Sequence, residues 1–334
     1  MRKLLQRLLT KPLMWISNRL AASPRKELVF KSLTQLHKTG QKKKSTRLKV
    51  IPIDFSTAKF IIFSDQHKGN TSWADDFNAC ETNYVAALEY YNSQQYHFIN
   101  LGDSEELWKF TATDILTKHQ ASFKAEAAFQ PRRYFKTFGN HDIIWKNKLD
   151  VIMHLKKIFS MPLPVYEGII LRSREIDIFL THGHQGDLMS DNNAFSTWIV
   201  AHIWMPLQRY LRINPNSASN DYSLRNLHNK FMYEWSSRQK NLVLVTGHTH
   251  QPVFASGRYH EHPSNNIPTG KPRDAARPSY FNTGCCCFND GDITGIELSG
   301  GFIRLIKWDE EETGSKRKVL EEVKISQLIS DLME

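Results

Sequence analysis

Five short motifs rich in Asp, His and Asn each follow a stretch of apolar residues. They are Ser64-Asp65-Gln66-His67, Gly102-Asp103, Gly139-Asn140-His141-Asp142, Thr181-His182-Gly183-His184 and Gly247-His248-Thr249-His250. In α/β sheets, ligands bind beyond the carboxyl ends of the strands, where the loops converge on one edge. If each apolar stretch forms a strand, the five motifs therefore bring their side chains to a single site.

The residue types in these motifs suit divalent metals. Carboxylates and imidazoles together favour manganese, iron, zinc or nickel. A carboxylate can bridge two cations, and two metals about 3.5–4 Å apart can hold the attacking and leaving oxygens of a phosphoryl transfer and generate hydroxide near neutral pH. The motifs contain no cysteine, which argues against a structural zinc site. The pattern predicts a two-metal centre for phosphoester chemistry.

The elements that would position these motifs follow an α/β pattern. Apolar runs predict strands at 50–53, 60–63, 98–101, 134–138, 176–180, 242–245, 280–282, 293–298 and 302–308. Helical patterns follow several of the early strands, whereas the late strands are closely spaced, as in an antiparallel meander. Two packed sheets in a mixed α/β domain fit this pattern best.

The five motifs in this order resemble the calcineurin-like metallophosphoesterase family, over roughly residues 55–300. The resemblance implies a four-layer αββα sandwich with two divalent metal ions. It also implies that one metal is held by Asp65, His67 and His250, that the second is held by Asn140, His182 and His248, and that Asp103 bridges them. His141 would contact the phosphate and protonate the leaving oxygen, Asp142 would orient His141, and Asn140 would also contact substrate.

The interval between His182 and His248 predicts a helical cap at about residues 188–240. Its first part, 195–211, is strongly apolar and carries Arg209, with Arg212 just beyond it. These arginines are candidates for binding substrate phosphates, and apolar helices beside them could receive lipid chains. The alternative is that the aromatic residues only pack the cap onto the domain. His184 is a candidate substrate contact, or a residue that holds a metal ligand in place.

One branch of the family is especially similar. Residues 101–108 and 247–252 resemble UDP-2,3-diacylglucosamine hydrolases, which cleave a lipid-bearing pyrophosphate at a membrane surface, typically with Mn²⁺. We therefore expect a phosphorylated small molecule or lipid as substrate and Mn²⁺ as the metal. That branch usually carries Arg at the position of His141, so a different substrate remains open.

The positive charge is concentrated at the N-terminus. The net charge is +10, yet residues 1–50 hold fourteen Lys or Arg and one acidic residue. We define residues 1–48 as a basic N-terminal arm. Residues 3–20 are amphipathic, and a helix is expected from Ser23-Pro24 with Val29, Leu33 and Leu36 on one face. The arm could contact an anionic membrane, pack on the domain or, less favourably, bind nucleic acid.

Other features of the sequence indicate the cellular location and the domain boundaries. No apolar run is long enough for a transmembrane helix, and the N-terminus is a poor signal peptide, although an organelle transit peptide stays open. We expect a cytoplasmic protein, peripheral at the inner membrane face. The domain is predicted at 49–312, followed by a C-terminal helix at 313–334. Cys285, Cys286 and Cys287 are expected to be buried on a strand.

Three functions are compatible with these features. The first is an enzyme that cleaves a lipid- or nucleotide-linked phosphodiester or pyrophosphate. The second is a nuclease or cyclic-nucleotide phosphodiesterase on the same metal centre, whose binding would weaken steeply with salt. The third is a non-catalytic scaffold with a phosphoesterase-like fold. Such a scaffold would be expected to have lost metal-binding residues, whereas every expected metal ligand is present in this sequence.

Overall fold

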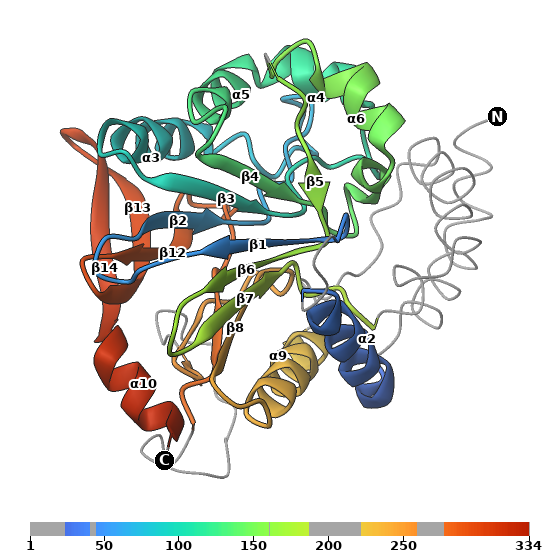
Figure 1. Cartoon of the computed structure of the whole chain (residues 1–334). Coiled ribbons are helices and arrows are strands. Elements are labelled where there is room, and N and C mark those ends of the chain that lie inside the picture. Colours follow the sequence, from blue (N-terminus) through green and yellow to red (C-terminus); the bar gives the residue numbers. More distant parts are fainter. Residues whose placement is uncertain (1–23, 41–44, 160, 187–221, 259–276, 334) are drawn as a thin grey trace.

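The computed structural model describes residues 24–40, 45–159, 161–186, 222–258 and 277–333. Two sheets lie against each other, and helices cover both outer faces (Figure 1). This arrangement confirms the mixed α/β fold with two packed sheets. Each sheet has seven strands in the described residues.

The first sheet combines a parallel half with an antiparallel half. Its order is β14-β13-β12-β2-β3-β4-β5. The parallel strands are β2 (Lys59–Phe63), β3 (His97–Leu101), β4 (Tyr134–Thr137) and β5 (Val165–Tyr166). The antiparallel meander is β12 (Ile293–Ser299), β13 (Phe302–Glu311) and β14 (Gly314–Lys324). These three strands are consecutive in the chain and pair antiparallel, as expected for the closely spaced late strands.

The second sheet has the order β1-β6-β7-β8-β11-β9-β10. Its strands are β1 (Leu48–Pro52), β6 (Gly168–Arg172), β7 (Asp177–Thr181), β8 (Leu242–Thr246), β9 (Val253–Phe254), β10 (Gly257–Arg258) and β11 (Tyr280–Asn282). Strands β7 and β8 are parallel, as are β8 and β11. Their carboxyl ends therefore point the same way, which places the loops after β7 and β8 together.

Strand β2 shows why the layers form. Phe60 and Ile62 lie in the core between the sheets, whereas Ile61 and Phe63 lie in the core on the outer face. Successive side chains of a strand point to opposite faces, so an uninterrupted apolar run requires a partner on both sides. The outer layer here comprises α3 (Glu81–Ser93), α4 (Ala112–Lys118), α5 (Gln120–Ala127), the 3-10 helix η1 (Ile143–Lys146) and α6 (Lys148–Leu155).

The outer face of the second sheet is covered by α2 (Lys26–Thr39) and α9 (Tyr222–Ser236) (Figure 1). Val29, Leu33 and Leu36 are buried on one face of α2, as the sequence predicted. Trp235 Nε1 on α9 donates to Thr34 Oγ1 at 3.0 Å and joins the two helices. Helix α2 begins two residues after Pro24. This part of the N-terminal arm packs on the domain, whereas the predicted amphipathic segment 3–20 lies outside the described residues.

The predicted C-terminal helix is wrong over most of its length. Residues 314–324 form β14, and only α10 (Ile325–Met333) is helical. Strand β14 pairs antiparallel with β13, and cross-strand ion pairs support it, including Lys318–Asp309 at 2.7 Å and Arg304–Glu322 at 2.9 Å. The sequence reading missed this because a charged edge strand has no apolar alternation to mark it.

The predicted helical cap is only partly described. Residues 187–221 lie outside the described residues, which leaves the apolar segment 195–211 as a prediction. The remainder contains α9, whose Met232 and Trp235 are buried in the core against the second sheet. In the described ranges, no helix has the length and apolarity needed to cross a bilayer.

Candidate metal centre

The five predicted motifs meet at one edge of the two sheets. Backbone hydrogen bonds tie the loops together: His67 N–H donates to the Asp103 carbonyl at 2.9 Å. His248 N–H donates to Asp65 Oδ2 at 2.9 Å, and His141 N–H donates to Asp103 Oδ1 at 2.8 Å. Each aspartate therefore has one oxygen held by a neighbouring loop and a second oxygen directed elsewhere.

The backbone is strained at this edge. Asp65, His67, Asp103, His248 and His250 all have positive φ, between 50° and 69°. For residues other than glycine this left-handed conformation is uncommon and costs roughly 1–3 kcal/mol each. Such strain persists only where surrounding contacts over-determine it, and it clusters at functional sites. Five strained residues at one edge mark this edge as functional.

Two glycines allow the loops to approach so closely. A Cβ at Gly139 would collide with the Asp103 carboxylate, and a Cβ at Gly247 would collide with Ser64 and the Asp65 carboxylate. The glycines of the predicted motifs therefore make room for the carboxylates of neighbouring loops.

The predicted ligands of the first metal come together. His250 Nε2 lies 3.2 Å from Asp65 Oδ1 and 3.1 Å from His67 Nε2. His67 Nε2 also lies 3.8 Å from both Asp65 Oδ1 and Asp103 Oδ2. These separations suit atoms that share one cation.

The predicted ligands of the second metal lie beside the first set. His182 Nε2 is 3.0 Å from Asp103 Oδ2. Asp103, His182 and His248 offer ligand atoms within 4.8 Å of one another, and Asp103 also belongs to such a group with His67 and His141. Asp103 thus lies between the two sets, in the place expected of a bridging carboxylate.

Hydrogen bonds hold two of the histidines with Nε2 directed into the site. His182 Nδ1 donates to the Leu101 carbonyl at 3.0 Å. His67 Nδ1 lies 3.2 Å from Glu106 Oε2. Metal-binding histidines usually use their second ring nitrogen in this way, which sets the tautomer and the ring orientation.

The pKa values of the site residues are shifted by opposite charges that lie close together. Burial disfavours the charged form of Asp103, yet His182 and His141 outweigh it and lower the Asp103 pKa. Burial likewise opposes protonation of His182, but Asp103 and Asp65 raise its pKa to about 9. A cation bound by these residues would compete with the proton on His182.

Several buried polar atoms at this edge find no partner outside the set of predicted ligands. Asn140 Oδ1 has no hydrogen-bond partner among the described residues, and Asp65 Oδ1 and His182 Nε2 face only other predicted ligands. Leaving such atoms unsatisfied is costly, and all three belong to predicted ligands. Their oxygen and nitrogen donors match those that divalent transition metals accept, so the residues present fit a metal centre.

His141 lies at the rim of the site. Its ring stacks on Trp108 with centroids 4.0 Å apart, and its Nδ1 lies 2.9 Å from Glu106 Oε1. The prediction that Asp142 orients His141 is wrong: Asp142 accepts from Gly139 N–H at 2.6 Å and Ser104 N–H at 3.0 Å instead. The side chain of Asp142 is turned into the protein, where it fixes the loop backbone. Burial raises its pKa to about 7.

Glu106 is a site residue that sequence reasoning missed. It is buried and serves both His67 and His141, and these two histidines outweigh burial to lower its pKa well below the usual range. The only sequence signal was its position three residues after Asp103, since two neighbouring acidic residues, Glu105 and Glu106, do not reveal which one faces the site.

The predicted substrate-binding residues have different outcomes. His184 is buried beside His182, with ring centroids 5.5 Å apart, and burial lowers its pKa to about 3. Its position beside His182 fits a residue that holds a metal ligand in place, and the substrate contact of His184 stays a prediction. Arg209 and Arg212 lie outside the described residues.

Helix α9 supplies further contacts that the sequence did not reveal. Asn229 Oδ1 accepts from Thr249 Oγ1 at 3.1 Å and from the Tyr280 hydroxyl at 2.8 Å. The His228 ring lies against His248, with centroids 5.0 Å apart. Helix α9 therefore holds the loop that carries His248 and His250.

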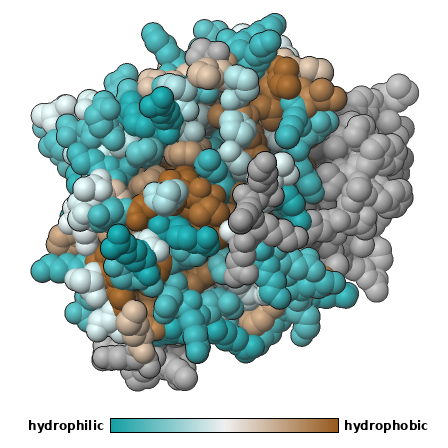
Figure 2. All heavy atoms as spheres, in the orientation of Figure 1, coloured by the Kyte–Doolittle hydropathy of each residue, from teal (hydrophilic) through white to brown (hydrophobic). Residues whose placement is uncertain are grey.

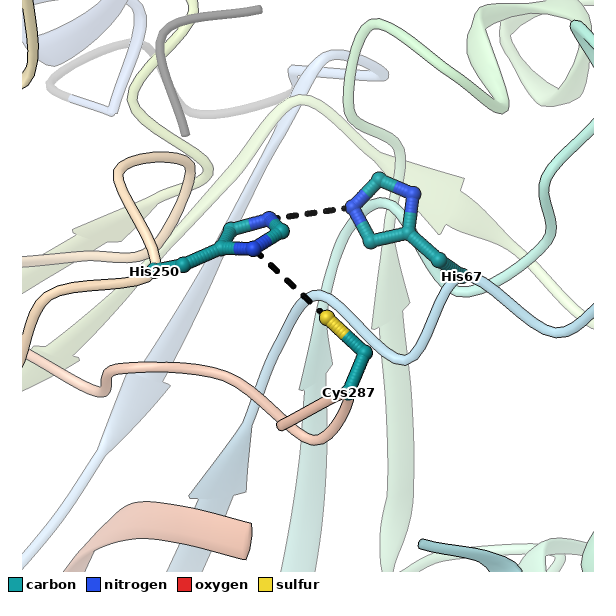
Figure 3. Close-up of side chains that lie close together, drawn as sticks. All are labelled: His67, His250 and Cys287. Atoms are coloured by element: carbon teal, nitrogen blue, oxygen red, sulfur yellow. Dashed lines mark hydrogen bonds between the residues drawn. The ribbon is translucent and has the colours of Figure 1, made fainter. Parts of the chain in front are cut away.

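The three adjacent cysteines are buried, as predicted, but they lie in the loop after β11 and not on a strand. All described cysteines are free. The Cys287 sulfur lies 3.5 Å from His250 Nδ1, beside the predicted metal ligands (Figure 3).

Comparison with solved structures finds distant similarities. The chain is similar to Vps29 from Cryptosporidium parvum, at 12% identity and a TM-score of 0.34, covering 80% of this chain and 98% of that one. It is also similar to a dimetal phosphatase from Danio rerio, at 8% identity and a TM-score of 0.39, covering 79% of this chain and 99% of that one. No curated protein shows significant similarity to the chain.

The family comparison covers the motifs themselves. The model of the calcineurin-like phosphoesterase family matches residues 58–252, which is more than half of the chain and includes all five motifs. Together with the converging ligand sets, this match shows that the chain belongs to the calcineurin-like phosphoesterase family.

Proposed function

We propose that the protein hydrolyses a phosphodiester or pyrophosphate bond at a dinuclear metal centre. The observation that carries this proposal is the position of Asp103, which belongs to two adjoining groups of candidate ligands. When bound, a metal pair supplies a water-derived nucleophile and charge for the phosphate oxygens. The family relationship supports phosphoester chemistry, and Mn²⁺ is our expected metal, following the branch resemblance.

The residues of this chain have separate tasks in that reaction. Asp65, His67 and His250 would hold one ion, and Asn140, His182 and His248 would hold the other. His141 stands at the rim, where an imidazole can bind a phosphate oxygen or give a proton to the leaving oxygen. Glu106 orients the His141 ring, and Trp108 supports its face.

We further propose that the substrate is lipid-linked and is reached at an anionic membrane surface. Helix α6 follows the Gly139–Asp142 loop along the chain, after the 3-10 helix η1. Leu149, Ile152 and Met153 on this helix are 67%, 51% and 66% exposed, and Figure 2 shows hydrophobic atoms gathered over α6. Exposed lysines surround them: Lys146, Lys148, Lys156 and Lys157.

This combination of charge and apolarity favours a lipid surface over a protein partner. Apolar side chains can enter the headgroup region while lysines contact anionic lipids, at roughly 1 kcal/mol per basic residue. The similarity of residues 101–108 and 247–252 to UDP-2,3-diacylglucosamine hydrolases supports the same substrate class.

Metal-dependent hydrolysis tests the proposed reaction. The wild type and Asp103→Ala would be loaded with Mn²⁺ and assayed on bis-p-nitrophenyl phosphate, p-nitrophenyl phosphate, UDP-diacylglucosamine and single-stranded DNA. We expect hydrolysis of the UDP-linked lipid by the wild type and none by the variant. Preference for DNA would favour a nuclease, and no hydrolysis by a metal-loaded wild type would favour the non-catalytic scaffold.

Vesicle sedimentation tests the membrane proposal. The full chain should sediment with anionic vesicles more than with zwitterionic ones, and the double variant Leu149→Glu/Ile152→Glu should sediment less. Met333→Glu is the matched control, because Met333 is 63% exposed on α10. Equal losses for the two variants would contradict a specific role for α6.

A further inference from the structure

His250 has different neighbours on its two ring nitrogens. Nε2 faces the predicted metal ligands, 3.1 Å from His67 Nε2 and 3.2 Å from Asp65 Oδ1. Nδ1 lies on the opposite side of the ring, 3.5 Å from the Cys287 sulfur. Figure 3 shows one nitrogen of the His250 imidazole facing the His67 ring and the other facing the thiol.

We propose that Cys287 is a positioning residue of the metal centre, whose sulfur accepts a hydrogen bond from His250 Nδ1–H. This bond keeps Nε2 free of a proton and directed at the ion. The inference rests on the dinuclear centre of the proposed function, and it adds a residue outside the five motifs.

The other histidines of the site follow the same rule. His67 uses its Nδ1 toward Glu106, and His182 uses its Nδ1 toward the Leu101 carbonyl. A metal-binding histidine needs such a partner to fix its tautomer, and loss of the partner typically costs about 10–100-fold in metal affinity. For His250, the Cys287 sulfur lies 3.5 Å from Nδ1, and the Cys285 thiol is also within hydrogen-bonding reach of this imidazole.

A second observation locates the ion on the far side of the ring. Asp65 Oδ1 is buried and lies 3.2 Å from His250 Nε2, the nitrogen that does not face the sulfur. A cation shared by Asp65 and His250 would therefore be bound through Nε2. The sulfur contacts the nitrogen that the cation does not use.

Direct ligation by Cys287 is the main rival. His67, His250 and Cys287 offer donor atoms within 4.8 Å of one another, so a thiolate ligand is geometrically conceivable. The contact with Nδ1 favours positioning, and the two roles differ spectroscopically. A thiolate bound to Co²⁺ produces an intense charge-transfer band in the near ultraviolet, whereas a hydrogen-bonding thiol does not.

The experiment is an absorption titration of the full-length, metal-free protein with Co²⁺. The variants are Cys287→Ala, which removes the acceptor, and Cys287→Ser, which keeps a shorter one. Cys286→Ala is the matched control, since Cys286 is buried in the core on the outer face of the first sheet. Cys285→Ala tests whether the other thiol near His250 takes the same role.

We expect two binding steps in the wild type, without a thiolate charge-transfer band. In Cys287→Ala one step should weaken about 10–100-fold, Cys287→Ser should recover part of the loss, and Cys286→Ala and Cys285→Ala should bind like the wild type. A charge-transfer band that Cys287→Ala abolishes would make Cys287 a ligand and overturn the proposal. Unchanged affinity in Cys287→Ala, or an equal loss in Cys285→Ala, would also overturn it.

Failure of the underlying function gives a different result. If the wild type binds no Co²⁺, the dinuclear centre itself is wrong, and the inference about Cys287 falls with it. If the wild type binds two ions and hydrolyses no substrate, the proposed reaction fails while the role of Cys287 in metal binding is still measured.

Discussion

Glu106 Oε1 lies 2.9 Å from His141 Nδ1, so a carboxylate from the loop after β3 orients the histidine in the loop after β4. The same carboxylate lies 3.2 Å from His67 Nδ1. One buried side chain thus links a predicted metal ligand to the predicted acid. This link is absent from the five motifs.

Replacing Glu106 should impair both catalysis and metal binding. In Glu106→Gln we expect kcat to fall about 10–100-fold and metal affinity to weaken, because both imidazoles lose an ionic partner. Steady-state kinetics and metal titration would measure this. Asp142→Asn is the comparison: it should lower the thermal midpoint, because Asp142 holds the Gly139 and Ser104 amides. Equal kinetic losses in the two variants would contradict the separate roles.

The role of His141 predicts a dependence on the leaving group. His141→Gln should reduce hydrolysis of an alkyl phosphodiester by about 10²-fold or more, because a basic alkoxide needs a proton to depart. A p-nitrophenyl ester should be affected much less, since p-nitrophenolate departs without protonation. Parallel kcat measurements on both esters provide the check. An identical loss on both would indicate that His141 only binds the phosphate.

A buried ion pair beneath the site should be essential for stability. Lys68 Nζ lies 2.6 Å from Glu126 Oε1 and 2.7 Å from Ser104 Oγ, and both charged side chains are fully buried. Lys68→Met should destabilise the fold by about 3–5 kcal/mol, because Glu126 would keep an uncompensated charge.

The matched double variant separates charge from packing at this pair. Lys68→Met/Glu126→Gln should recover much of the lost free energy of unfolding, because the buried charge is removed. Denaturant titration would measure all three proteins. A double variant no more stable than Lys68→Met would show that packing, not the unpaired charge, causes the loss.

His119 should contribute a pH-dependent part of the stability. Its Nε2 lies 2.8 Å from Asp75 Oδ2 and its Nδ1 lies 3.0 Å from Glu81 Oε2. Burial opposes protonation, but both carboxylates outweigh it and raise the His119 pKa above its ordinary value of 6.5. A raised pKa in the folded state gives stability that is complete below the unfolded pKa and is lost as pH rises through the folded pKa.

We therefore expect the wild type to lose stability relative to His119→Gln as the pH rises above 6.5, through the raised pKa of the folded state. Thermal midpoints of both proteins across this range would measure the difference. Parallel curves would contradict a charged His119 in the folded protein. Because Asp75 also accepts from Gly69 N–H and Thr71 N–H, the same change should loosen the loop after His67.

The sequence by itself determined the order of the motifs, the ligand types and the strands that carry them. This was possible because the seven predicted ligands lie directly after apolar runs, and parallel strands bring such positions to one edge of their sheet. The burial of Val29, Leu33 and Leu36 was also predictable from their spacing on one helical face.

Only the tertiary structure decided which residues support the ligands. Glu106 and His141 are 35 residues apart in sequence, and Cys287 and His250 are 37 apart, so their meeting depends on how separate loops pack. The same holds for Asp142: although it is adjacent to His141 in sequence, its carboxylate accepts hydrogen bonds from backbone amides and does not contact the His141 imidazole. Strand β14 was hidden for a related reason: its stability comes from pairing with the edge of β13, and that edge exists only in the folded sheet.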